Sequence, residues 1–94
     1  MNYAALITVD NSDEDPEAGR RGLREELLPA MRTMPGFSSC LFLTAHERGR
    51  GVGIVVFETL EQAKNLADSV AVGSTIHPGV TVMASEVMEV TASA

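Results

Sequence analysis

The chain has no tryptophan, one tyrosine and only three phenylalanines among its 94 residues. Its apolar residues, 45% of the total, are therefore mostly aliphatic, which is typical of a packed core and not of an aromatic surface that stacks on nucleic-acid bases. Basic residues are scarce as well, seven against thirteen acidic ones, and the net charge of −6 opposes binding to phosphates. We therefore expect no DNA or RNA partner.

Disulfide partners and long apolar runs are also missing. Cys40 is the only thiol, so no disulfide can form within the chain, and its place in the middle of an apolar run predicts simple packing. No apolar run approaches the roughly 20 residues that cross a bilayer, and the first residues lack the pattern of a secretion signal. These absences predict a cytoplasmic protein without a membrane partner, formed by one domain, residues 1–94.

What is present is a repeated order of strand, helix and strand. The run Tyr3–Val9 is apolar on both alternating sets and predicts a strand that is covered on both faces. Asp15 as N-cap and Pro16 as the first helical residue predict the start of a helix. Pro29 is expected to kink or interrupt this helix, and Pro35-Gly36 to end it. Its apolar stripe consists of Leu23, Leu27, Met31 and Met34.

A β-hairpin is predicted next. Two apolar runs, Ser39–Ala45 and Val52–Phe57, flank a turn of alternating arginine and glycine. The glycines of this turn precede a strand and not a helix, so they do not form the cluster of backbone donors that binds phosphate. Phe42 and His46 share one alternating set of the first strand.

The second half ends in another helix and strand. Thr59 and Gln62 have the spacing of a capping box, and Gly73 is expected to stop the helix that they begin. Residues 74–79 are expected to form a loop, and Val80–Thr91 a long final strand. The inner stripe of the helix consists of Ala63, Leu66, Ala67 and Val70.

This order of elements predicts an α+β fold, the ferredoxin-like βαββαβ arrangement with an antiparallel four-stranded sheet and both helices on one face. All four predicted strands are apolar on both alternating sets, although two helices cover only one side. A second copy packed on the open side of the sheet would bury the other set. We therefore expect a homodimer in which two sheets pair as a barrel.

Three stretches resemble the dimeric α/β-barrel superfamily, and within it the antibiotic-biosynthesis-monooxygenase-like domains. They are Leu28–Phe37 with its Met-Pro-Gly-Phe ending, the apolar hairpin, and Phe57–Ala63 with its Phe-Glu-Thr-Leu-Glu-Gln-Ala sequence. The resemblance covers nearly the whole chain. It implies a dimeric barrel with an apolar cavity and a cofactor-independent monooxygenase acting on an aromatic or polyketide-like compound.

The resemblance does not extend to haem breakdown. Haem-degrading members have an asparagine in the first strand, a tryptophan before the second helix and a histidine within that helix. This chain has no asparagine in its first strand, and the other two positions match Phe57 and a place near Ala67. For the polyketide oxygenases, the nearest matches to their cavity residues are Phe57 and Asn65. No cofactor is implied.

Two histidines are the candidate catalytic residues, because imidazole exchanges a proton near neutral pH. His46 ends the second strand, where it either faces a cavity as a general base or is solvated beside the turn. His77 lies in the loop before the last strand, and such loops either carry function or only connect elements. The candidate ligand-pocket residues are Tyr3, Phe42, Phe57, Asn65 and Met83.

Some of these pocket candidates have two interpretations. Tyr3 either donates a hydrogen bond into the cavity or anchors an edge of the dimer. The methionines either fill the core or together line an adaptable apolar pocket.

The acidic run Asp10–Asp15 lacks the spacing of a calcium loop, and two distant histidines with one cysteine do not form a zinc set. We expect no metal, and interpret the run as a solvated approach to the helix.

Two functions are compatible with the sequence. The first is a barrel that binds an apolar or aromatic small molecule, as an oxygenase or isomerase in which His46 or His77 moves a proton. The second is a non-catalytic dimeric module, a ligand carrier or an assembly domain, whose interior is filled by its own side chains. A void of roughly 300 Å³ or more distinguishes the first from the second.

Overall fold

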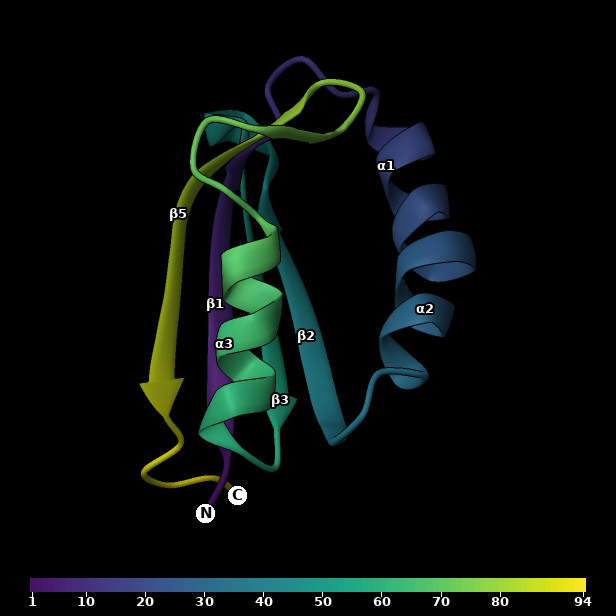
Figure 1. Ribbon diagram of the computed structural model, residues 1–94. Helices are drawn as coiled ribbons and strands as arrows, with labels where there is room; N and C mark the ends of the chain where they lie inside the picture. Colours follow the sequence, from purple (N-terminus) through teal and green to yellow (C-terminus); the bar gives the residue numbers. More distant parts are fainter.

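The computed structural model describes all 94 residues and is built around one curled antiparallel sheet with the strand order β2-β3-β1-β5-β4 (Figure 1). The helical segments lie on one side of this sheet. The α+β class and an arrangement compatible with the ferredoxin-like fold are thereby confirmed. The strands are β1 (Tyr3–Asp10), β2 (Phe37–Ala45), β3 (Arg50–Phe57), β4 (Thr75–His77) and β5 (Val80–Glu89).

The sheet has five strands, so the prediction of four was wrong. The additional strand is β4, in the segment that was expected to be a loop, where Thr75 pairs with Thr81 and His77 with Val80 of β5. Gly79, at a φ of 82°, makes the turn between the two strands. Three residues are too few to show an alternating apolar pattern, so the sequence carried no signal for this edge strand.

The first helix is continuous but changes its winding. It consists of α1 (Pro16–Gly22), the π-helical segment η1 (Leu23–Leu27) and α2 (Leu28–Arg32). The predicted start is confirmed, because the Asp15 carboxylate accepts a hydrogen bond from the Ala18 amide at 3.2 Å. This bond satisfies one of the amides that have no partner in the first helical turn.

Pro29 explains the π-helical segment. In a regular α-helix its ring would clash with the carbonyl one turn earlier, and it donates no hydrogen bond. The turn before it is wider, and the Leu28 amide donates to the carbonyl of Leu23, five residues earlier. The expected disturbance at Pro29 is therefore a local change of winding within one helix.

The second helix, α3 (Leu60–Ser69), packs closely on the sheet. Its capping box is confirmed, since the Gln62 amide donates to Thr59 Oγ1 and the Thr59 amide to Gln62 Oε1, both at 3.2 Å. The helix ends at Ser69, before the predicted stop at Gly73. None of the helices combines the length and the apolar character that a membrane span requires.

The core lies between α3 and the strands β1 and β3. Its buried members are Ala5, Val55, Phe57, Ala63, Leu66 and Ala67. The two alanines of α3 are small enough for the helix backbone to approach the sheet closely. The first helix contributes less, because Met31 is only partly buried against this cluster.

The other side of the sheet is apolar and has no helix over it. We define the open face by residues whose strand register places them on this side: Leu6, Leu41, Leu43, Val52, Ile54 and Met88. Leu41, Leu43 and Met88 are exposed. Glu86, opposite Leu6, is the charged group within it, and Asp10 and Arg50 pair at one end. The strands are therefore apolar on both sides, as the sequence indicated.

Candidate functional site

A cavity of about 500 Å³ lies between the first helix and the sheet. This volume falls within the range of roughly 300–1,000 Å³ that small-molecule sites occupy. The cavity is on the side of the sheet that carries the helices, and two residues of the open face, Leu43 and Val52, also border it. Its apolar wall includes Ile7, Val9 and Val55 from the sheet and Leu23, Leu27 and Met31 from the helix.

Two glycines of β3 keep this space open. Gly51 and Gly53 line the cavity at positions where larger side chains would project into it. The Phe42 ring lies over Gly53, and a Cβ atom at position 53 would be 2.9 Å from its nearest carbon. The floor of the cavity is therefore backbone, with an aromatic ring laid against it.

Polar groups gather near the start of α1. Glu14 precedes this helix, Arg20 lies on it, His46 begins the 3-10 turn η2 (His46–Arg48) after β2, and His77 ends β4. All four line the same cavity. An apolar pocket with a few convergent polar groups at one end is the usual form of a site that binds and orients one small molecule.

The closest of these polar contacts joins Glu14 and His77. Nδ1 of His77 is buried and lies 3.1 Å from Oε2 of Glu14, off the direction in which its N–H bond would point. The Glu14 side chain is 15% exposed, so the contact is shielded from water more than a surface ion pair. A small rotation of the ring or the carboxylate turns this contact into a hydrogen bond.

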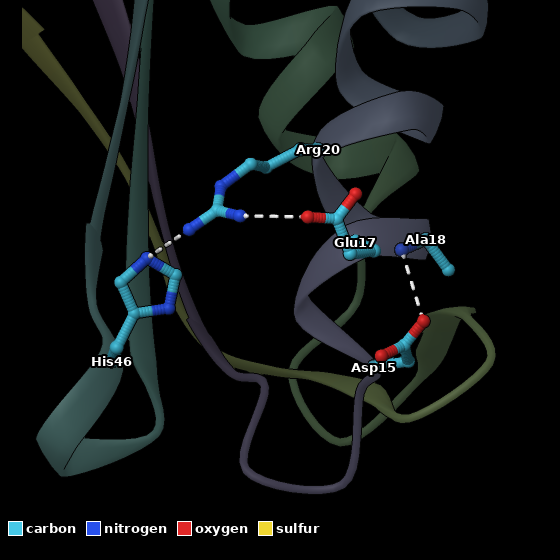
Figure 2. A network of polar contacts seen from close by, with 5 residues as sticks. All are labelled: Asp15, Glu17, Ala18, Arg20 and His46. Carbon is cyan, nitrogen blue, oxygen red and sulfur yellow. Dashed lines mark hydrogen bonds and ion pairs between the residues drawn. The ribbon is translucent and has the colours of Figure 1, made fainter.

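Arg20 reaches from α1 to His46 (Figure 2). Its Nη2 lies 3.5 Å from Nε2 of His46, and its Nη1 lies 3.5 Å from Oε1 of Glu17. A guanidinium group only donates hydrogen bonds, so this contact is a hydrogen bond only in the tautomer in which Nε2 of His46 accepts. The contacts are long and exposed, and they contribute little to stability.

The acidic segment before α1 is tied to the hairpin. The Glu14 amide donates to the carbonyl of Asn11, and the Asn11 amide donates to the carbonyl of Gly49, at 3.0 and 2.9 Å. Gly49 has a φ of 61°, the left-handed conformation that glycine adopts without strain. The expectation of a merely solvated approach was wrong for Glu14, which this turn holds at the cavity.

Asp10 begins the same turn. Its carboxylate accepts hydrogen bonds from Oγ and the amide of Ser12, at 2.6 and 2.9 Å. These bonds, the hydroxyl first, together with the charge of Arg50, hold the pKa of Asp10 below its ordinary value. Ser12 also lines the cavity, so the ionised carboxylate fixes the cavity rim at this point.

The structure brings three of the sequence-predicted site residues together. His46 and His77 both line the cavity at its polar end, and Phe42 lines it beside Gly53. His46 follows β2 and His77 ends β4, the two strands at opposite edges of the sheet. Both histidines lie beside α1, His46 at Arg20 and His77 at Gly22. Their catalytic role stays a prediction.

The other four pocket candidates do not line the cavity. Phe57 is 1% exposed and belongs to the core under α3. Tyr3 packs at the edge of that core, with its hydroxyl 3.8 Å from the sulfur of Met1. Asn65 is on the exposed side of α3, and Met83 is the extra residue of a β-bulge in β5 and is exposed.

Sequence reasoning missed Glu14 and Arg20 as members of the site. The two glycines of α1, Gly19 and Gly22, were a signal for it. Glycine destabilises the interior of a helix, so its presence there often indicates a close contact or a functional role. A spacing of three places them on one side of the helix. They lie against Glu14 and His77 respectively.

No group of three or more His, Cys, Asp or Glu side chains lies close enough together to hold a metal ion. No model of a known protein family and no curated protein matches the chain. The family resemblance therefore stays a prediction from the residues quoted above, and the function has to be argued from the cavity.

Proposed function

We propose that the protein binds one apolar or aromatic small molecule in this cavity and acts on it as a cofactor-independent monooxygenase. The observation that carries the proposal is the cavity itself, about 500 Å³ with apolar walls and two imidazoles at one end. Its size exceeds the roughly 300 Å³ below which a drug-sized ligand has no site. The resemblance to antibiotic-biosynthesis-monooxygenase-like domains supports the choice of reaction.

The reaction needs a proton acceptor and a surface that binds an aromatic ring. A phenol that gives its proton to an imidazole becomes a phenolate, from which molecular oxygen takes electrons more readily. One oxygen atom becomes the new carbonyl of a quinone, and the other leaves as water with the hydrogens of the phenol O–H and of the attacked C–H. The walls around Leu27 and Met31 supply the apolar surface, and His46 or His77 the base.

We also propose that two copies pack through the open face. Apolar side chains on that face, such as Leu41 and Leu43, are exposed in the single chain. A contiguous apolar surface of this kind is typical of an interface, and a second copy offers the same surface, so a two-fold arrangement pairs like with like. This dimer closes two curled sheets into a barrel.

The dimer is tested by Leu43→Arg, with Leu60→Arg as a matched control. The two leucines are 49% and 46% exposed, but Leu60 lies on α3, on the opposite side of the sheet. In analytical ultracentrifugation we expect the wild type and Leu60→Arg to sediment as dimers and Leu43→Arg as a monomer. A monomeric wild type, or a dimer that survives Leu43→Arg, contradicts the proposal.

A second candidate is a ligand carrier without catalysis. It is favoured by one observation, that Phe57 and Asn65, the residues matched to oxygenase cavities, do not line this cavity. Oxygen uptake with a panel of hydroxynaphthoquinone-type and naphthol-type compounds separates the two. We expect uptake by the wild type and its reduction in His77→Gln or His46→Ala. Binding without any uptake across the panel contradicts the oxygenase and leaves the carrier.

A further inference from the structure

We infer that Glu14 is a positioning residue that holds His77 as the proton acceptor of the cavity, and that Gly19 and Gly22 provide the space for this pair. The inference rests on the proposed function only in that the cavity must bind a ligand with an acidic hydroxyl. It goes further by choosing between the two histidines and by giving a role to a carboxylate outside the predicted site.

The first step is the contact between the two side chains. Oε2 of Glu14 is 3.1 Å from the buried Nδ1 of His77, which makes no hydrogen bond while the two side chains stand as they do. A carboxylate at this distance favours the tautomer with the proton on Nδ1, because only a protonated Nδ1 forms a hydrogen bond with Glu14 once the ring or the carboxylate rotates slightly. Nε2 is then free to accept a proton, and hydrogen bonds of this kind shorten when a ligand is bound.

The second step is the space that the glycines leave. A Cβ atom at position 19 would overlap with the Glu14 carboxylate, and one at position 22 would lie 3.4 Å from Nε2 of His77. Gly22 has ordinary helical dihedral angles, so its backbone does not require glycine. Gly19 therefore provides room for the carboxylate, whereas a methyl group at position 22 would fit in ordinary contact and would cover Nε2 of the imidazole.

The third step compares the two histidines. Nε2 of His46 faces the guanidinium of Arg20 at 3.5 Å, so its lone pair points to a permanent donor. Nε2 of His77 faces Gly22, which has no side chain to cover it. Only His77 therefore combines a carboxylate at one nitrogen with an uncovered second nitrogen on the wall of the cavity.

The first test needs no ligand. Nitrogen-15 NMR of the histidine rings distinguishes the two neutral tautomers, and we expect the proton of His77 on Nδ1 in the wild type and in Glu14→Gln. In Glu14→Ala it should move to Nε2, the form that prevails for an imidazole in water, while His46 is unchanged. Glu17→Ala, which removes a nearby carboxylate that does not contact His77, is the control and should leave the tautomer on Nδ1. An Nε2-protonated His77 in the wild type overturns the inference.

The second test uses 2-naphthol as a probe, which is fluorescent and free of interference because the protein has no tryptophan. Excited 2-naphthol is a strong acid that gives its proton to a base in contact, and the ionised form emits at a longer wavelength. We expect bound 2-naphthol to emit mainly from the ionised form in the wild type. The ratio of ionised to neutral emission should fall about tenfold in His77→Gln and Glu14→Ala, and less in Glu14→Gln.

A parallel titration with 2-methoxynaphthalene, which has no proton to give, separates the two possible failures. If neither compound binds, the proposed function is contradicted and this inference falls with it. If both bind and 2-naphthol emits from its neutral form in the wild type, the cavity stands and the role of Glu14 and His77 is overturned. An unchanged ratio in Glu14→Ala contradicts the positioning role alone.

Discussion

The two helices cover the same side of one sheet in different ways. α3 approaches the sheet through Ala63 and Ala67 and shares a buried core with it. The helix of residues 16–32 buries only Gly19 completely and leaves a cavity of about 500 Å³ beneath its apolar stripe. One half of the sheet is thus used for stability and the other for a site.

The difference follows from the residues at each contact. Small side chains on α3 bring backbones together, so the large Phe57 below them is fully enclosed. Beneath the first helix, on the same side, the sheet offers Gly51 and Gly53, and the helix offers long side chains that reach only part of the way. A small domain can leave such a space open when the rest of its core is closely packed.

The largest effect that tests this comparison is the loss of a core ring. Phe57→Ala should lower the free energy of unfolding by about 3–5 kcal/mol, because it leaves a cavity in a closely packed site. Met31→Ala, in the wall of the existing cavity, should cost about 1 kcal/mol. Urea unfolding measures both. Equal losses of stability would mean that the region under α3 and the region under the first helix are packed alike.

Removing the N-cap of each helix compares how much α3 and α1 contribute to global stability, with smaller expected effects. Thr59→Ala removes the capping box of α3 and should cost about 1 kcal/mol of global stability. Asp15→Ala removes a comparable cap from α1, but should mainly increase hydrogen exchange in that helix, because α1 buries little. A global loss for Asp15→Ala as large as that for Thr59→Ala argues against a loosely attached first helix.

Gly22→Ala should separate stability from function. Alanine favours a helix over glycine by up to about 1 kcal/mol, and the backbone at this position accepts it. The added methyl group lies against Nε2 of His77, so ionised 2-naphthol emission should fall while the melting temperature is unchanged or higher. Loss of stability together with emission would point to a structural role of this glycine instead.

The smallest effect concerns Asp10 at the cavity rim. Its pKa is lowered in the folded protein, chiefly by the Ser12 hydroxyl, so it favours folding above its ordinary pKa. That contribution is lost as the pH falls through the lowered value. Ser12→Ala should raise the pKa of Asp10 toward 3.8, measured by carbon-13 NMR of the carboxyl group. An unchanged titration would mean that the hydrogen bond from the Ser12 amide, which the substitution keeps, and the charge of Arg50 lower the pKa without the hydroxyl.

Short-range signals were read correctly from the sequence. The caps at Asp15 and Thr59 act within one helical turn, so the chain itself contains both partners. The strands of the hairpin and the apolar open face follow from alternation, which needs only neighbouring residues. Edge strand β4 was missed, because three residues become a strand only through pairing with β5.

Fewer residues of the site could be predicted from the sequence, because segments that are far apart in the chain form it. Glu14 and His77 are far apart in the chain and meet only when β4 lies beside α1. Phe57 was assigned to the pocket, but the strand register places it under α3. Met83 was also assigned to the pocket. It lies at a β-bulge, which no local sequence pattern predicts, and its side chain does not line the cavity.

The most direct measurement is an NMR titration with 2-methoxynaphthalene that follows methyl groups on both sides of the sheet. We predict saturable shifts at Leu27 and Met31 and little change at Ala63 and Ala67. No saturable shift at Leu27 and Met31, or shifts centred on Leu41 of the open face, which does not line the cavity, would contradict a ligand site beneath the first helix.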